Sequence, residues 1–282
     1  MKKELKQKEI YSLEDCFCLK KKNVVIFGGA GKMAKSFSKA LLSAGCKSLI
    51  LVDINKERLE HVVKNLAKEF AGRDVHSYTC NVSDEAQVDE ASQFLKEKIS
   101  GIDVLIYAVM SKPRDYYAPF SEYSRATWDE VLDGNLSGAF LVTQKLIPLM
   151  NEEASIIFIS STYGIVAPDF RIYKNLSSNP YGGKYPLSLP AVYSASKAGL
   201  IGLGKYLAVY LADRNIRVNI LVPGGVYDYH DEAFYQEYIK RVPLKRMATW
   251  SDYNGAVIFL ASDASRYMTG QLLVVDGGWS VW

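Results

Sequence analysis

Short apolar runs alternate with amphipathic segments along almost the whole chain. The runs are rich in Val, Ile and Leu and stop at Gly, Asp or Ser, which is typical of buried strands. They predict strands at residues 23–29, 48–53, 75–80, 104–108, 155–160, 217–222 and 272–275. The segments between them predict helices at residues 32–44, 57–70, 84–99, 135–150, 193–211, 231–241 and 251–260. Strands separated by helices favour parallel pairing, because only a long crossover returns the chain to the same end of a sheet.

This alternation predicts an α/β fold class, a single Rossmann-like, doubly wound parallel sheet of about seven strands with helices on both faces. A chain of 282 residues, 49% of them hydrophobic, can bury one large core. No internal repeat or linker indicates a second domain. We therefore expect residues 1–22 to form a polar N-terminal extension and residues 23–282 to form one domain.

One stretch, residues 162–192, breaks the regular pattern. It is rich in Tyr, Pro, Asn, Ser and Gly and has no convincing period. Long loops in compact domains are usually functional or disordered. Because this loop follows a strand at the sheet edge where open α/β proteins bind ligands, we favour a substrate lid over a disordered insert.

Charge and composition restrict the partners. The net charge is only +3, from 34 basic and 31 acidic residues, so no strong field favours nucleic acid or a membrane surface. No stretch has the apolar length of a secretory signal or a membrane span, which predicts a cytoplasmic protein with a small-molecule partner. The four cysteines are expected to be reduced thiols. The three histidines are dispersed, so we expect no protein-ligated metal.

A glycine-rich turn joins the first predicted strand to the first helix. Gly28, Gly31, Lys32, Met33 and Ala34 occupy the place where backbone amides and a helix N-terminus bind a dinucleotide pyrophosphate. Glycine is needed there because a side chain would block the approach of phosphate. A simple tight turn between strand and helix is the alternative interpretation.

Asp53 ends the second predicted strand, where its carboxylate would meet the hydroxyls of the adenosine ribose. A carboxylate repels a 2′-phosphate, so NAD is favoured over NADP, although Lys32, Lys47 or Lys56 would soften that preference. The alternative role for Asp53 is a helix cap or turn residue.

Tyr193 and Lys197 lie one helical turn apart, just after a strand that ends in Ser160 and Ser161. A phenol is a poor base near neutral pH unless a neighbouring cation stabilises the phenolate, and Lys197 is placed to do so. Ser161 would then hydrogen-bond the substrate oxygen while Tyr193 exchanges its proton. The alternatives are a solvated lysine, an ordinary packed tyrosine and a polar strand end.

The order of these motifs resembles the short-chain dehydrogenase/reductase family over residues 21–282. The resemblance rests on the glycine turn, Asp53, Ile-Ser-Ser at 159–161, Tyr-Ser-Ala-Ser-Lys at 193–197 and Asn-Ile-Leu-Val-Pro-Gly at 219–224. It implies that Asn135 completes a catalytic tetrad by holding a water that relays protons to Lys197; a helix N-terminal residue without chemistry is the alternative. It also implies a homo-oligomer, either tetramer or dimer.

The resemblance adds residues at both ends of the cofactor. The cofactor-binding residues it implies, with those above, are Gly28, Gly31, Lys32, Met33, Asp53, Asn81, Val82, Ala108, Tyr193, Lys197, Pro223, Gly224 and Val226. Four sites depart from the family pattern: Phe27 replaces a threonine, Lys32 replaces a glycine, residues 107–110 read Tyr-Ala-Val-Met in place of Asn-Asn-Ala-Gly, and Asp228 replaces a threonine. These changes are expected to weaken cofactor binding without altering the chemistry.

Two wider matches, at residues 167–173 and 193–200, look like bacterial members of surface polysaccharide and flagellin-glycan biosynthesis. Together these features predict an NAD-dependent enzyme that interconverts a secondary alcohol and a ketone on a polar, sugar-related substrate. The substrate residues expected are Ser161, Tyr163, Arg171, Tyr173 and Tyr193, with Tyr181, Tyr185, Lys174 and Lys184 as further loop candidates. Two alternatives stay open: a dinucleotide sensor or scaffold on the same fold, and a tyrosine-rich surface contact for the loop.

Overall fold

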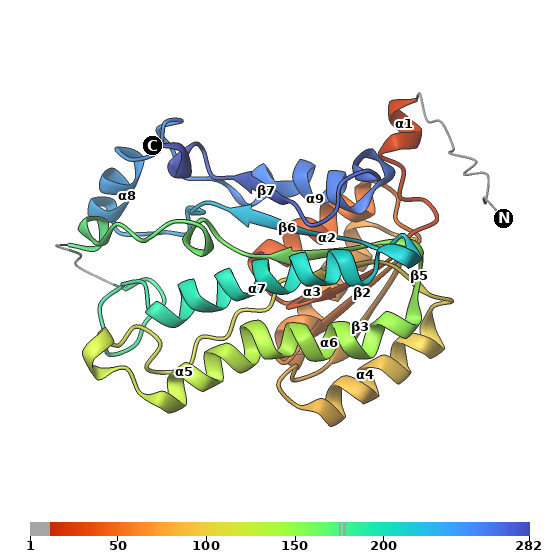
Figure 1. Ribbon diagram of the computed structural model, residues 1–282, viewed down its shortest axis with the longest axis horizontal. Coiled ribbons are helices and arrows are strands. Elements are labelled where there is room, and N and C mark those ends of the chain that lie inside the picture. The colour runs from red at the N-terminus through yellow and green to blue at the C-terminus, as the bar shows by residue number, and fades with distance from the viewer. Residues whose placement is uncertain (1–11, 175, 177–178) are drawn as a thin grey trace.

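A computed structural model describes residues 12–174, 176 and 179–282 of the chain (Figure 1). Residues 1–11 of the predicted N-terminal extension and residues 175, 177 and 178 of the long loop lie outside the described residues. Within the described part, the extension contains one short helix, α1 (Leu13–Cys16), and a fully buried side chain, that of Leu19.

The described residues form a seven-stranded parallel sheet in the order β3-β2-β1-β4-β5-β6-β7, which confirms the predicted fold class. The strands are β1 (Asn23–Phe27), β2 (Ser48–Asp53), β3 (Asp74–Thr79), β4 (Ile102–Tyr107), β5 (Met150–Ile159), β6 (Arg217–Pro223) and β7 (Leu272–Val275). The chain moves outward from β1 to β3 and then returns to the other side at β4. This reversal between β1 and β4 opens a crevice at the carboxyl ends of the strands.

Helices cover both faces of the sheet, as Figure 1 shows. α2 (Lys32–Ser43), α3 (Lys56–Glu69) and α9 (Asn254–Ala261) pack on one face, and α4 (Glu85–Lys98), α6 (Gly138–Leu146) and α7 (Ala191–Tyr210) on the other. Residues of β1 alternate between the two cores: Val24 and Ile26 face the first, Val25 and Phe27 the second. No helix among the described residues is long and apolar enough to span a membrane.

The predicted helix at 135–150 is wrong at both ends. A helical run begins ten residues earlier with α5 (Arg125–Leu132), where the Ser124 side chain accepts a hydrogen bond from the backbone N–H of Thr127. It continues through a π-helical turn, η2 (Asp133–Ser137), into α6. A short 3₁₀ helix around Pro148 then ends the run, so β5 begins at Met150 rather than at 155.

The π turn is fixed from below by β4. The hydroxyl of Tyr107, the last residue of β4, donates a 2.5 Å hydrogen bond to the carbonyl oxygen of Gly134. Tyr107 is fully buried, and its ring contacts Phe27 and Phe158 on the flanking strands. A π turn leaves backbone groups without regular helical partners, and this phenol satisfies one of them.

A separate apolar cluster covers the carboxyl end of the sheet, at the left of Figure 1. It joins η5 (Phe170–Tyr173) in the long loop, α8 (Glu232–Ile239) and the C-terminal 3₁₀ helix η9 (Trp279–Val281). Ile172 and Leu187 from the loop are buried in it. The described part of the loop is therefore packed onto the domain. The remaining 3₁₀ helices are η1 (Phe120–Glu122), η3 (Ile147–Leu149), η4 (Thr162–Gly164), η6 (Ala212–Arg214), η7 (Trp250–Tyr253) and η8 (Asp263–Ser265).

The first prediction concerns Gly28. Gly28 and Gly72 both have a φ of +82°, but a Cβ at Gly28 would lie 2.7 Å from the carbonyl of Ala108, whereas nothing lies within 4 Å at Gly72. Both alanine substitutions should cost about 1 kcal/mol for the left-handed backbone. Gly28→Ala should lower the free energy of unfolding by about 1–3 kcal/mol more, because the overlap is with backbone. Urea titration of both variants measures the difference, and equal losses would contradict the close contact.

A second prediction concerns the phenol under the π turn. Tyr107→Phe should lower the free energy of unfolding by about 1–3 kcal/mol, because the buried Gly134 carbonyl loses its donor. Tyr267→Phe is the control, since Tyr267 is fully exposed, and it should change stability by less than about 0.5 kcal/mol. The free energies of unfolding are measured by urea titration. If the two variants lose the same amount, the Tyr107 hydrogen bond does not hold the turn.

Candidate active site

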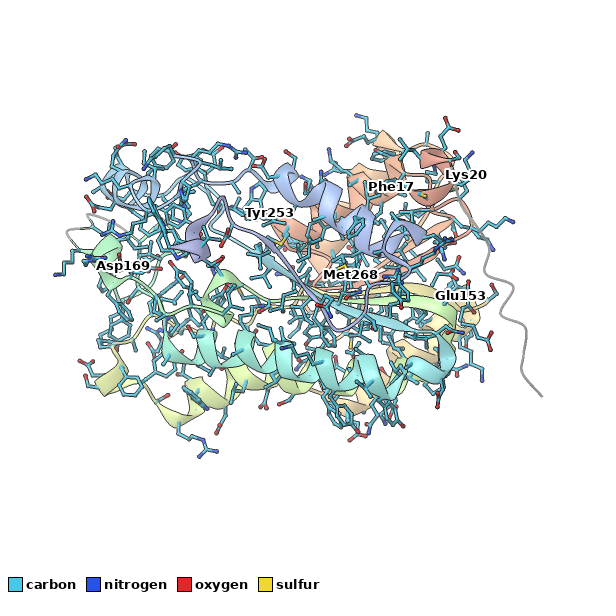
Figure 2. The ribbon with its side chains drawn as sticks, turned by 45° about the horizontal axis from the view of Figure 1, so that its top comes forward. Phe17, Lys20, Glu153, Asp169, Tyr253 and Met268 are labelled. Atoms are coloured by element: carbon cyan, nitrogen blue, oxygen red, sulfur yellow. The ribbon has the colours of Figure 1, made fainter. Side chains whose placement is uncertain are left out.

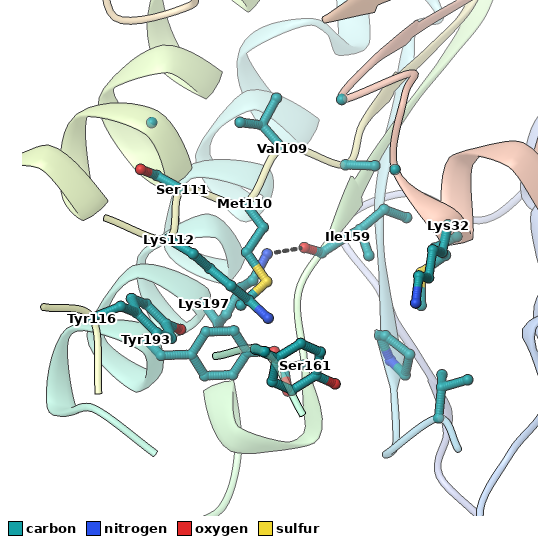
Figure 3. A pocket seen from close by; sticks show the side chains of 18 of the residues that line it. Lys32, Val109, Met110, Ser111, Lys112, Tyr116, Ile159, Ser161, Tyr193 and Lys197 are labelled. Carbon is teal, nitrogen blue, oxygen red and sulfur yellow. Dashed lines mark hydrogen bonds between the residues drawn. The ribbon is translucent and has the colours of Figure 1, made fainter. Parts of the chain in front are cut away.

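A cavity of about 1210 Å³ lies at the carboxyl ends of the strands (Figure 3). It extends from the end of β2 past the glycine turn to the start of α7. Almost all predicted site residues line it: Gly28, Gly31, Lys32, Met33, Asp53, Asn81, Val82, Ala108, Ser161, Tyr163, Tyr173, Tyr193, Lys197, Pro223, Gly224 and Val226. The fold thus brings together residues nearly 200 positions apart in sequence, such as Lys32 and Asp228.

The glycine turn points the N-terminus of α2 into the cavity. The amides of Gly28 and Gly29 donate to the carbonyl of Val52, which holds the turn against β2. Gly31 is the N-cap of α2, and no side chain caps the helix. The first amides of a helix have no partners within the helix, so this uncapped end is suited to an anion such as a phosphate.

Asp53 lines the cavity and also supports the turn. One carboxylate oxygen accepts a 2.9 Å hydrogen bond from the amide of Ala30, and the other accepts one of 2.9 Å from the amide of Asn55. Asn55, and not Asp53, caps α3. The turn role considered for Asp53 is therefore present, and its carboxylate keeps further lone pairs for a ligand at this end of the cavity.

Two departures from the family pattern bind each other. The Lys32 ammonium contacts both carboxylate oxygens of Asp228, at 2.5 and 2.8 Å, across the cavity. The side chain of Asp228 is only 8% exposed, so without a cation it would be a poorly solvated charge. Lys32 thus compensates for the carboxylate that replaces the usual threonine.

Tyr193 and Ser161 meet at the inner end of the cavity. The Ser161 hydroxyl is close enough to the Tyr193 phenol to lower its pKa. Burial acts in the opposite sense and is the larger effect, so the pKa of Tyr193 lies above its usual value. The phenol of the ligand-free protein is therefore a proton donor at neutral pH.

Lys197 lies beside Tyr193 at the carboxyl end of β5. Its ammonium lies 5.9 Å from the centre of the Tyr193 ring and donates a 2.9 Å hydrogen bond to the carbonyl of Ile159, the contact dashed in Figure 3. Burial lowers the pKa of Lys197 to about 8. The lysine is thus held beside the phenol but is stabilised by the end of β5.

The side chain of Asn135 links two segments of the domain near Tyr193. It is fully buried and does not line the cavity. Its side-chain oxygen accepts a hydrogen bond from the backbone N–H of Ser111, and its side-chain nitrogen donates one to the hydroxyl of Ser196. That hydroxyl donates in turn to the backbone carbonyl of Tyr193. Since both polar atoms of the amide are used, Asn135 ties the segment after β4 to the helix that carries Tyr193.

The loop residues divide into two groups. Tyr163, Tyr173 and Tyr181 line the cavity, whereas Tyr185, Arg171, Lys174 and Lys184 do not. Arg171 is exposed and binds both carboxylate oxygens of Asp169, at 2.9 and 2.8 Å. Figure 2 labels Asp169 near the left edge of the molecule. The acidic residue two positions away thus holds the Arg171 guanidinium outside the cavity, and contact of Arg171 with substrate stays a prediction.

Several cavity residues were not predicted. They come from the irregular segment after β4, from α8 and from the C-terminus: Lys112, Tyr116, Tyr117, His230, Phe234, Tyr238 and Trp279. The only sequence signal for any of them was the high number of tyrosines in the chain. Among the described residues, no group of three His, Cys, Asp or Glu side chains is arranged to hold a metal ion.

Comparison with known proteins identifies the family. A family model described as short chain dehydrogenase matches residues 22–173, and one described as enoyl-(acyl carrier protein) reductase matches residues 171–280. A 3-oxoacyl-(acyl-carrier-protein) reductase of Thermotoga maritima is 34% identical over 92% of this chain and 98% of its own length. Post-translational flagellin modification protein A of Campylobacter coli is 30% identical over 93% of this chain and all of its own length.

Solved structures agree with these matches. A short-chain dehydrogenase of Leptospira borgpetersenii with bound NAD⁺ is 30% identical, with a TM-score of 0.78 over 97% of both chains. A gluconate 5-dehydrogenase of Burkholderia cenocepacia in complex with NADP and tartrate is 26% identical, with a TM-score of 0.80 over 95% of this chain and 99% of that one. The resemblance inferred from the motifs is confirmed, and the chain belongs to the short-chain dehydrogenase/reductase family of NAD(P)-dependent oxidoreductases.

Proposed function

We propose that this enzyme interconverts a secondary alcohol and a ketone on a polar, sugar-related substrate, with NAD as cofactor and Tyr193 as general acid and base. The observation that carries the proposal is that Ser161 and Tyr193, which are close enough for Ser161 to lower the pKa of the phenol, line the same cavity as the uncapped N-terminus of α2. One end of the cavity is suited to phosphate and the other to proton transfer.

The cavity residues fit a nicotinamide dinucleotide. Asp53 and Asn81 would hold the adenosine end, and the glycine turn with Lys32 would hold the pyrophosphate. Pro223, Gly224 and Val226 would border the nicotinamide. Bound there, the cofactor supplies or accepts the hydride.

Ser161 and Tyr193 would act on the substrate oxygen. In the reducing direction, the neutral phenol of Tyr193 donates its proton to the oxygen of the carbonyl, while the Ser161 hydroxyl donates a hydrogen bond to the same atom. In the oxidising direction, Tyr193 receives the alcohol proton, which requires a lower pKa than burial alone allows. Ser161 and the buried ammonium of Lys197 are the groups on this chain that favour the phenolate.

The lining of the substrate end supports a hydroxylated substrate. Tyr163, Tyr173, Tyr181 and Trp279 line the cavity, and the three tyrosines lie within electrostatic range of Tyr193. Tyrosine combines a flat apolar face with a hydroxyl, which suits sugar rings better than an acyl chain. The similarity to a flagellin modification protein is consistent with a role in polysaccharide or flagellin-glycan biosynthesis.

We also propose that the enzyme is a cytoplasmic homo-oligomer, either dimer or tetramer. Exposed aromatic and apolar side chains on α6 and α7 support association: Phe140, Tyr206, Val209 and Tyr210. Apolar groups gathered on adjacent helices are typical of subunit contacts.

Turnover by a Tyr193→Phe variant tests the proposed chemistry. The substitution should reduce kcat by about 100-fold or more, because the proton donor is lost, and leave NADH affinity within about twofold. Tyr206→Phe, on the same helix but outside the cavity, is the control and should retain full activity. Sugar ketones and polyols are assayed by NADH absorbance, and cofactor binding by NADH fluorescence. Tight NADH binding by the wild type without turnover of any of them would favour the alternative, a dinucleotide sensor or scaffold.

The preference for NAD depends on the charge of Asp53. Asp53→Asn keeps the shape of the side chain but removes the repulsion of a 2′-phosphate, so the ratio of kcat/KM for NAD to that for NADP should fall about tenfold. Asp129→Asn is the control, since it removes a negative charge elsewhere in the cavity lining. Equal effects of the two variants would show that Asp53 does not select the cofactor.

A further inference from the structure

We propose that Lys112 binds an anionic group of the substrate, so that the enzyme acts on a sugar acid or a sugar phosphate rather than on a neutral polyol. This inference rests on the proposed function and specifies its substrate class. Carboxylate and phosphate share the chemistry that a lysine recognises, an oxyanion that accepts charge-assisted hydrogen bonds.

The position of Lys112 is the first argument. It lies in the irregular segment after β4 and lines the cavity, where Figure 3 draws it near Ser161 and Tyr193. Its ammonium lies 3.9 Å from the centre of the Tyr181 ring. The phenol of Tyr181 lies within electrostatic range of both Asp228 and Tyr193. Lys112 is therefore at the substrate end of the cavity, on the side of the proton donor.

The charge balance around Lys112 is the second argument. Asp228 is the nearby carboxylate, but it is bound by Lys32 through both oxygens. Among the described residues, Lys112 makes no ion pair and no side-chain hydrogen bond, and its ammonium lies over the face of the Tyr181 ring. Burial lowers the pKa of Lys112 to about 8, so the amine is still mostly protonated at neutral pH. A cation that is accessible from the cavity but lacks an anion is an anion-binding group.

A buried phenol next to the site is the third argument. Tyr116 is only 2% exposed and lines the cavity, and its hydroxyl has no hydrogen-bond partner among the described residues. This phenol also lies within electrostatic range of Tyr193. An unsatisfied buried hydroxyl is costly, and a substrate hydroxyl would satisfy it. The substrate would thus carry hydroxyl groups as well as the anionic group.

The cofactor does not account for Lys112. The pyrophosphate has the uncapped end of α2 and Lys32, and Lys32 lies within electrostatic range of Lys112. The contact of Lys112 with the Tyr181 ring places its ammonium next to a phenol that also lies within range of Tyr193. A role at the cofactor would be detected as a change in NADH affinity, which the experiment measures separately.

The test compares Lys112→Met with Lys184→Met. Lys184 is the matched control because it also lies over a tyrosine ring, that of Tyr185 at 4.9 Å, but outside the cavity. The purified full-length enzyme is assayed with aldonic and ketoaldonic acids, with sugar phosphates and with neutral polyols and ketoses. NADH affinity is measured by fluorescence for each variant.

Lys112→Met should lower kcat/KM for the anionic substrates about 10- to 100-fold, mainly through KM, and leave neutral substrates and NADH affinity within about twofold. Lys184→Met should change none of these. A larger effect on acids than on phosphates identifies carboxylate as the natural anion, and the reverse identifies phosphate. Tyr116→Phe should raise KM for hydroxylated substrates about fivefold without changing NADH affinity.

Two results would overturn the inference while leaving the proposed function intact: turnover of neutral substrates with no preference for anions, or equal losses on neutral and anionic substrates in Lys112→Met. A loss of NADH affinity in that variant would assign Lys112 to the cofactor instead. If the wild type turns over no sugar derivative of any class, the proposed function fails and the inference fails with it.

Discussion

The contact between the Gly28 turn and the end of β4 is the constraint on which the site depends. The space that a Cβ would occupy at Gly28 is filled by the carbonyl of Ala108, and the amide of Ala108 donates to the carbonyl of Phe27. The two central strands can therefore end side by side with nothing between them. This close approach directs α2 into the crevice on one side of β1 and sends the segment with Lys112 over the other side.

The residues that depart from the family pattern compensate for one another. Asp228 introduces a negative charge where the family has a neutral hydroxyl, and Lys32 introduces a positive charge where it has no side chain, and the two bind each other. Tyr107 likewise stands where the family pattern has an asparagine, and its hydroxyl donates a hydrogen bond to the carbonyl of Gly134. Both oxygens of Asp228 are bound by Lys32, so Asp228 lies within electrostatic range of Lys112 without forming an ion pair with it.

The fold was predictable because its signals are local. Val and Ile runs, the glycine turn and the Ser161, Tyr193 and Lys197 spacing each lie within a few residues, and the parallel sheet follows from their alternation. The early start of the helical run was missed because Asn135 resembles a helix start, while the true cap is Ser124. The five residues of the π turn are too few to show a hydrophobic period, so the sequence did not indicate that the helix continues through them.

The roles of Arg171 and Lys112 show why the substrate end was harder to predict. Arg171 was predicted to bind an anion of the substrate because it is a guanidinium group in a loop. The acidic residue two positions before it, Asp169, binds it instead, and this neighbour is visible in the sequence. Lys112 had no such signal, since its position depends on where β4 ends and on Tyr181, nearly 70 residues later. Contacts made by irregular segments depend on tertiary packing, and a pattern of hydrophobic positions carries no information about them.

Burial explains both the chemistry and the selectivity of the cavity. It raises the pKa of Tyr193 and lowers the pKa values of Lys197 and Lys112, so each group is shifted toward its neutral form before a ligand arrives. A ligand that brings the opposite charge reverses such a shift and gains the corresponding binding energy. An anion beside Lys112 would restore the full positive charge of that amine, whereas a neutral sugar would leave it unpaired. The same desolvation that keeps a proton on Tyr193 therefore favours a charged substrate over an uncharged one.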